Sequence, residues 1–339
     1  MNIRDFIFLT INKSGFRKAL YSKKRGQVIT ILNLHRISEE ENYFWQPLHP
    51  NNFEELVKYV TRNYNVIHFS DIVDLSRSKN EKPPLILSFD DGYFDFVHHA
   101  IPVLNKYQCK SNHNIVIDCV ERNATIWTQH LNHIFNELRN REHVGTIEFE
   151  GVRFDCNGNK TKWEQTYIGV FYHLMHMKHS FRKDFIAFCY QTAFINPPNI
   201  KMMNWDDIRN CVRSGVEIGN HTYTHDSFAS EITKEELNRE VIESKKIIES
   251  QTGKPCTIFS FPNGQFNDNV LNTVLNAGYD FLLFADNKFQ TKSAQKSSNG
   301  PDFISRINII NESIDEMMLR VEGFHNFQRK RLNSGTQLG

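Results

Sequence analysis

Short apolar runs and longer amphipathic segments alternate along most of this chain. Each apolar run has the length of a buried strand, and the intervening segments have the periodicity of helices that cover a sheet. The predicted strands are residues 28–34, 66–69, 85–89, 114–118, 216–219, 257–261, 281–285 and 303–309. The predicted helices are residues 53–64, 71–75, 94–107, 205–213, 234–250 and 268–277, with a last one after Ser313. This alternation predicts a parallel β/α barrel, with a doubly wound open sheet as the main alternative.

The alternation stops between about residues 121 and 200, where helical patterns dominate (129–139 and 163–190) around a strand-like piece at 146–154. We therefore expect a mostly helical insertion on one barrel loop, a place where substrate selectivity is often built. Its aromatic residues are expected to form either a core or a wall for sugar stacking. The predicted organisation is a helical, basic segment (1–27), a barrel with this insertion (28–322) and a C-terminal tail (323–339).

Two carboxylates, Asp90 and Asp91, end the predicted strand 85–89, and Gly92 follows them. In parallel α/β folds ligands bind at the carboxyl ends of strands. Adjacent carboxylates repel each other, and a bound cation is a common way to keep both ionised. The alternative is that one of them caps the next helix.

Two histidines, His221 and His225, follow the predicted strand 216–219. If the backbone turns helically there, both rings point to one side and can bind one metal. A carboxylate from Asp90 or Asp91 would complete a set of ligands that leaves positions open for water, as catalytic metal sites do.

A third polar strand end has Asn263 between Pro262 and Gly264. A tight turn here would direct the backbone N–H of Asn263 to the same rim, where a fixed donor stabilises an oxyanion. An ordinary turn is the alternative interpretation.

Composition narrows the class of protein. The chain has 339 residues, 40% of them apolar and 23% charged, as in ordinary soluble proteins. Its net charge of +1 provides no overall field for nucleic acid. Six scattered cysteines indicate free thiols in a reducing compartment. The apolar run 6–9 is too short for a signal peptide or a membrane span, so a cytoplasmic location is expected.

A basic cluster follows that apolar run: Arg17, Lys18, Lys23, Lys24 and Arg25. A solvated helix face explains it. A peripheral contact with an anionic membrane surface is the alternative.

Taken together, the segments SFDDG, HTYTH and FPNG, in this order and at strand ends, resemble the polysaccharide deacetylases of the NodB-homology, carbohydrate esterase family 4 type. The resemblance extends to ILNLHRI and to NWDDIRNCVRSGVEIGNHTYTH, and covers about residues 28–310 without the insertion. It implies a distorted (β/α)7 barrel. It also implies a divalent metal, usually zinc, that helps to remove an acetyl group from an N-acetylated sugar.

The resemblance also implies roles for single residues. Asp90 falls on the catalytic base, Asn263 on the backbone donor of the oxyanion hole, and three residues on metal ligands: Asp91, His221 and His225. We further expect substrate contacts from residues beside these motifs: Tyr93, Pro262 and Gly264.

The chain departs from the better-known members at three points, one of which is that an Asp-x-x-Trp type motif is not recognisable near residues 280–286. The arginine that usually orients the base is absent from the segment 259–261, and Arg306 is the candidate replacement, with a plain ion pair at the barrel rim as the alternative. The motif that supplies the general acid is not evident after Arg306. His35 is the preferred candidate for an acid or substrate contact, and His325 a weaker one, whereas a structural role for His35 is the alternative.

These departures resemble the branch that acts in cell-surface polysaccharide and O-antigen assembly. The expected substrate is an N-acylated sugar that is nucleotide-, lipid- or glycan-linked. Two alternatives remain open: removal of an O-acetyl or N-formyl group by the same site, and a catalytically silent relative that binds glycan or partner proteins.

Overall fold

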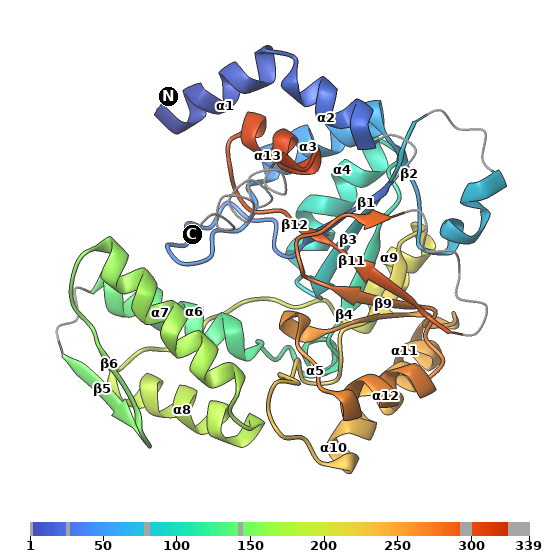
Figure 1. The fold of residues 1–339 in the computed structure, drawn as a ribbon. Coiled ribbons are helices and arrows are strands. Elements are labelled where there is room, and N and C mark those ends of the chain that lie inside the picture. Colours follow the sequence, from blue (N-terminus) through green and yellow to red (C-terminus); the bar gives the residue numbers. More distant parts are fainter. Residues whose placement is uncertain (1–2, 25–27, 78–81, 142–144, 292–299, 325–339) are drawn as a thin grey trace, which may run out of the picture.

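The computed structural model describes residues 3–24, 28–77, 82–141, 145–291 and 300–324. Its centre is a parallel sheet whose strands follow one another around a ring (Figure 1). In ring order these are β1 (Val28–Leu34), β3 (Pro84–Asp91), β4 (Asn112–Ile115), β7 (Glu217–Asn220), β8 (Ile258–Ser260), β9 (Phe281–Phe284) and β11 (Asp302–Ser305). Two short strands pair at the edges, β2 (Asn65–Val66) with β3 and β10 (Gln290–Thr291), antiparallel, with β1.

The ring closes at Arg306. We predicted one strand over 303–309, but the structure has β11 and then β12 (Ile307–Asn308), interrupted at Arg306. Strand β11 pairs with β9, whereas β12 pairs with β1. This change of partner joins the two ends of the sheet, so the predicted distorted barrel with seven strand positions is confirmed and the open sheet is excluded.

The alternation of side chains along each strand explains why polar residues lie inside the barrel. In β3 the odd-numbered Leu85, Leu87 and Phe89 belong to the core under the helices, while Ile86 belongs to a second core inside the ring. Ser88 and Asp90 continue the inward row of Ile86 because strand side chains alternate between faces. The interior therefore changes from apolar at one end to polar at the carboxyl ends of the strands.

Helices surround the sheet (Figure 1). They are α3 (Pro50–Asn63), α4 (Ile101–Lys106), α9 (Trp205–Arg213), α10 (Lys234–Asn238), α11 (Ser244–Thr252) and α12 (Asp268–Asn276). Single-turn π-helices precede α4 (Phe96–Ala100) and connect α10 with α11 (Arg239–Glu243), and 3-10 helices cover Ser70–Arg77 and Pro262–Gly264. The predicted helices are thus present, several of them in shorter pieces.

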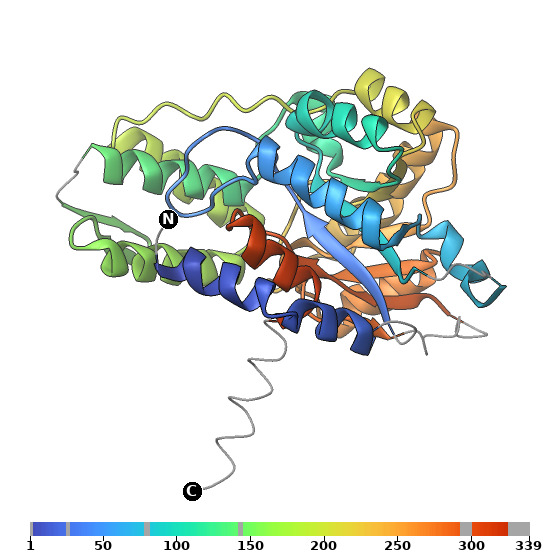
Figure 2. The ribbon, with the colours of Figure 1, turned by 90° about the horizontal axis from the view of Figure 1, so that it is seen from above.

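The segment between β4 and α9 forms a lobe beside the barrel (Figures 1 and 2). Helix α5 (Ile117–Arg122) packs on the barrel core. The lobe itself consists of α6 (Trp127–Asn140), β5 (Thr146–Phe149), β6 (Val152–Asp155), α7 (Lys160–Met175) and α8 (His179–Thr192). Two predictions are corrected here. Strand β4 begins at Asn112 and ends at Ile115, because α5 takes over from Ile117, and the helix expected over 163–190 is broken between α7 and α8.

The N-terminal helices α1 (Ile3–Lys13) and α2 (Phe16–Lys24) lie at the outside of the molecule, next to the last described helix, α13 (Ile314–Val321). None of the described helices has both the length and the apolar character needed to cross a membrane. Arg25, His325 and most of the predicted C-terminal tail lie outside the described residues.

Candidate active site

A cavity of about 450 Å³ opens at the carboxyl ends of the strands. Its polar floor consists of the following residues: Asn33, His35, Asp90, Asp91, His221, His225, Arg306 and Asn308. The ring topology brings these side chains together from β1, β3, β12, the break before β12, and the loops after β1 and β7.

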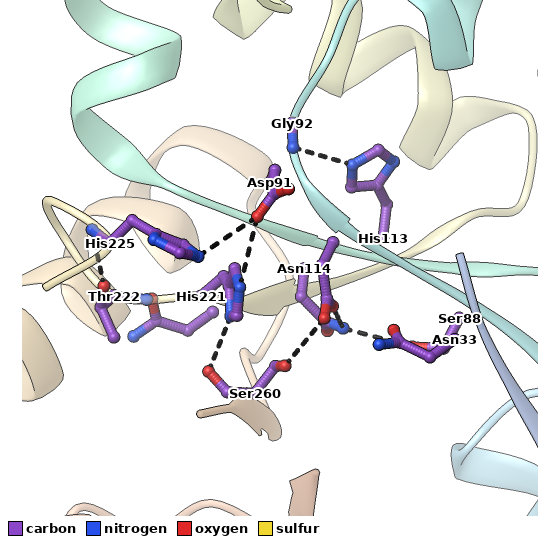
Figure 3. Close-up of polar contacts among 12 residues, drawn as sticks. Asn33, Ser88, Asp91, Gly92, His113, Asn114, His221, Thr222, His225 and Ser260 are labelled. Carbon is purple, nitrogen blue, oxygen red and sulfur yellow. Dashed lines mark hydrogen bonds and ion pairs between the residues drawn. The ribbon is translucent and has the colours of Figure 1, made fainter. Parts of the chain in front are cut away.

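Asp91, His221 and His225 converge on one point (Figure 3). The Nε2 atoms of His221 and His225 lie 3.4 and 3.5 Å from the same carboxylate oxygen, Oδ1 of Asp91. One ligand atom from each residue lies within 4.8 Å of the other two, and all three side chains are buried.

The hydrogen bonds around this cluster leave its ligand atoms free. Nδ1 of His221 lies 2.8 Å from the backbone oxygen of Ser260, and that oxygen accepts its proton. This bond orients the ring with Nε2 towards Asp91, as in metal sites where a carbonyl orients a ligating histidine. Burial alone would lower the pKa of His221, but the carboxylates of Asp90 and Asp91 raise it. Burial lowers the pKa of His225 to about 3, so its ring is neutral. Oδ1 of Asp91 is buried, and no described residue donates a hydrogen bond to it. The donor set therefore fits a divalent cation, and two imidazoles with one carboxylate suit zinc.

The backbone at the cluster is strained. Asp91, Thr222 and His225 have φ angles of 82°, 72° and 58°, which residues with a side chain seldom adopt. The helical turn that we assumed between His221 and His225 is therefore wrong: the segment is a loop. Thr222 Oγ1 accepts the N–H of His225 at 3.0 Å and stabilises this loop, so both rings still reach Asp91.

Asp90 is held by Arg306 across the ring. Nη1 and Nη2 of Arg306 donate to Oδ1 and Oδ2 of Asp90 at 2.9 and 2.8 Å, and both side chains are buried. Burial would raise the pKa of Asp90, but the charge and hydrogen bonds of Arg306 outweigh it and hold this pKa well below its usual range. The carboxylate is therefore ionised and fixed in orientation.

Sequence analysis missed three further residues at this site, and two of them hold the Asp90–Arg306 pair. Asn114 Nδ2 donates to Oδ1 of Asp90 at 2.7 Å, and Ser260 Oγ accepts from Arg306 Nη2 at 2.8 Å. His113 acts on the other side of the strand end, where its Nε2 accepts the N–H of Gly92 at 3.1 Å (Figure 3). The polar run 112–114 in a buried strand was the available signal, because buried polar groups need partners.

Of the other predicted site residues, His35, Asn263 and Tyr93 line the cavity. The ring of His35 packs against that of Trp45, with the centroids 5.5 Å apart. The backbone of Asn263 has a φ of 54° in a tight turn. The hydroxyl of Tyr93 is buried, and it has no hydrogen-bond partner among the residues that the structure describes.

Pro262 and Gly264 are not among the described residues that line the cavity. The side chain of Pro262 is buried, and Gly264 adopts a positive φ of 66° next to Ala285. They shape the turn that places Asn263, and the structure gives them no direct contact with the cavity.

One wall of the cavity is apolar. Part of it comes from α7 in the insertion: Tyr167, Ile168, Phe171, Tyr172 and Met175. Phe44 and Trp45, from the loop after β1, complete it. Ile168 and Tyr172 are half exposed, at 50% and 56%, which leaves room for an apolar or ring-shaped group of a ligand.

Residues 189–282 match the family model described as polysaccharide deacetylase. This part of the chain is therefore similar to a polysaccharide deacetylase domain. The matched residues include His221, His225 and Asn263. Asp90, Asp91 and Arg306 come from outside this part, and the fold brings them to the same cavity.

A curated protein that is named as a deacetylase is similar to part of this chain. A peptidoglycan-N-acetylglucosamine deacetylase of Bacillus cereus is 35% identical over 78 residues, which is 23% of this chain and 36% of that protein. The chain thus spans about a third of the length of that curated relative.

Solved structures with similar folds include the Streptococcus pyogenes deacetylase PplD in complex with acetate, with a TM-score of 0.58 and 14% identity over 87% of this chain and 98% of that one. Another is BC0361, a polysaccharide deacetylase from Bacillus cereus, with a TM-score of 0.57 and 17% identity over 87% and 69% of the two chains. At these identities the likeness shows the shared barrel.

Proposed function

We propose that this protein is a metal-dependent hydrolase that removes an N-acetyl group from a sugar in cell-surface polysaccharide or lipopolysaccharide biosynthesis. The observation that carries the proposal is the position of Asp91, His221 and His225 around one point, in the same cavity as an ionised, tethered Asp90. A closed structural metal site has four protein ligands, whereas three leave room for water and substrate.

Asp91, His221 and His225 would hold the cation, which in such sites supplies Lewis acidity that polarises an acyl carbonyl and makes water more acidic. Asp90 takes the proton from the attacking water. Arg306 keeps Asp90 ionised and aims its oxygens, so the base does not have to reorganise during the reaction.

Two other groups complete the proposed chemistry. The backbone N–H of Asn263 stabilises the negative charge that develops on the acyl oxygen, because the turn at 262–264 fixes its direction. His35 lines the same cavity and protonates the leaving amine. Its neighbour Trp45 restricts the ring.

The proposed substrate is an N-acetylated sugar linked to a nucleotide, a lipid or a longer glycan. The polar floor suits the acetamido group, the buried hydroxyl of Tyr93 is a donor for a sugar hydroxyl, and the apolar wall suits the linked group. The acetate in the S. pyogenes neighbour is the acid that this reaction releases, which supports the assignment. We place the reaction on the cytoplasmic side of the membrane, because the six cysteines are all free and five are buried.

The test is to incubate the purified protein with acetamido-sugar nucleotides and follow the loss of an acetyl mass by mass spectrometry. Matched O-acetylated and N-formylated sugars distinguish the other reactions of the same site. Asp90→Asn should retain the metal and lose turnover. If the wild-type protein binds metal stoichiometrically and still releases no acyl group from any class, the protein is a glycan- or partner-binding relative and the proposed activity is wrong.

A further inference from the structure

Helix α1 presents apolar side chains to solvent. On its inner face Phe8 packs with Leu319 and Phe324, and Arg4 donates to Glu316 at 2.9 and 2.6 Å. The outer face has Ile3, Phe6 and Ile7, which are 81%, 58% and 49% exposed. We call these three residues the apolar stripe.

The spacing of the apolar stripe places it on one side of the helix. Residues three and four apart are neighbours on a helix surface, so Ile3, Phe6 and Ile7 adjoin one another. The inner face alone accounts for the packing of α1 against α13. The exposed apolar side chains therefore have no role in the described fold, and their grouping points to a partner.

The charges around the apolar stripe identify this partner. Residues 3–24 contain six basic residues and only one acidic residue, while the whole chain has a net charge of only +1. The basic residues are Arg4, Lys13, Arg17, Lys18, Lys23 and Lys24. Lys13, Lys18 and Lys23 have exposed side chains. A second copy would bring the same positive charges face to face, whereas an anionic lipid surface attracts them.

We propose that helices α1 and α2 bind the surface of an anionic lipid bilayer, with the apolar stripe inserted between the headgroups and the exposed lysines at the lipid phosphates. Helices that lie in a membrane interface combine these features, and both contributions are needed for firm binding. Here α13 already holds α1 in place, so less chain order has to be gained on binding. This interaction is independent of the deacetylase chemistry.

The experiment is co-sedimentation of the full chain with vesicles of phosphatidylcholine alone or of equal parts phosphatidylcholine and phosphatidylglycerol. We expect binding to the anionic vesicles to be at least about tenfold tighter than to the neutral ones, and to weaken in high salt. Equal binding to both vesicle types would overturn the proposed role of charge.

Two double variants separate the contribution of the apolar stripe to vesicle binding from that of the lysine charges. F6S/I7S should weaken binding to anionic vesicles at least about tenfold by removing two apolar anchors, and K13E/K18E should do so by reversing two charges. The matched controls are Phe194→Ser, at a residue that is 88% exposed on the insertion, and Lys183→Glu, an exposed lysine of α8. Both controls should bind like the wild type.

The substituted side chains are exposed, so each variant should fold. Thermal unfolding of each variant checks this. If the folded wild type does not sediment with anionic vesicles, or if F6S/I7S and Phe194→Ser behave alike, the proposal is wrong. Analytical ultracentrifugation tests the alternative. If the wild type self-associates and F6S/I7S abolishes this, the apolar stripe is an interface between copies and the membrane proposal is wrong.

Discussion

Arg306 and Asp90 form a two-point ion pair inside the barrel, although 216 residues separate them in the sequence. The guanidinium comes from the break between β11 and β12, and the carboxylate from the end of β3. Both are buried, so neither charge has water to replace a lost partner.

Arg306→Met should therefore both destabilise the protein and impair the reaction. Loss of one partner leaves a buried carboxylate uncompensated, which costs about 3–5 kcal/mol of unfolding free energy. Urea unfolding measures this, with Arg209→Met as the control. Arg209 pairs with Asp206 at the surface, and loss of such a pair costs about 0–1 kcal/mol. Similar losses in the two variants would contradict the importance of burial.

The metal content of two variants separates binding from catalysis. His221→Ala should lose stoichiometric metal, because it removes a ligand whose orientation Ser260 fixes. Asp90→Asn should keep the metal and lower turnover by at least about a hundredfold, since it removes the proposed base. Elemental analysis and acetate release report the two effects. Retained metal in His221→Ala would contradict the assignment of His221 as a metal ligand.

Tyr93→Phe should raise KM with little change in kcat. The hydroxyl of Tyr93 is buried at the cavity without a hydrogen-bond partner among the described residues, so it is available to a substrate group. Removal of one such bond costs about 0.5–1.5 kcal/mol of binding, a KM increase of roughly threefold to tenfold. Steady-state kinetics with the identified substrate test this. An unchanged KM would show that the substrate does not use this hydroxyl.

The stability of the protein should depend on pH through His130 in α6. Burial lowers the pKa of His130 to about 4, against about 6.5 in an unfolded chain. As pH falls between these values the unfolded state binds a proton that the folded state does not. The free energy of unfolding should thus fall by up to about 1.4 kcal/mol per pH unit.

His130→Gln should reduce this dependence, because the buried His113 and His225 contribute to it in the same direction. His173→Gln, at an exposed position on α7, should leave it unchanged. Urea unfolding at pH 7 and pH 5 provides the comparison. An identical pH dependence in the wild type and His130→Gln would refute the effect of burial at this position.

The positions of the strand-end residues could be predicted from sequence, because hydrophobic pattern locates strand ends and parallel topology brings them to one rim. Asp91, His221 and His225 are examples. Contacts across the ring could not be predicted. That Asn114 lies beside Asp90 depends on the register of β4 against β3, and one sequence does not specify it. The break at Arg306 was missed for the same reason: the run 303–309 has no breaker, and the strand divides because its two halves pair with different neighbours.

Close packing, as well as charge, constrains the candidate active site. Gly219 in β7 has so little room that an added Cβ would lie 2.1 Å from Oδ1 of Asn114 and 3.0 Å from Cβ of Ile258. Gly219→Ala should displace Asn114 and with it a hydrogen bond to Asp90, so turnover should fall although no group of the active site is removed. Activity normalised to metal content measures this effect, and normal turnover would show that the barrel can adjust here.

The change of strand partner at Arg306 also has a consequence for the order of folding. During synthesis β1, β3 and β4 emerge long before β12. Leu32 and Asn33 of β1 have no strand partner on that edge until residues 307 and 308 are made, and β10 pairs only with Val28 and Ile29. Asp90 lacks its counter-charge over the same interval. We therefore expect the barrel and the proposed catalytic centre to be completed late. Until then a growing chain exposes part of a strand edge, which favours misassembly or chaperone binding.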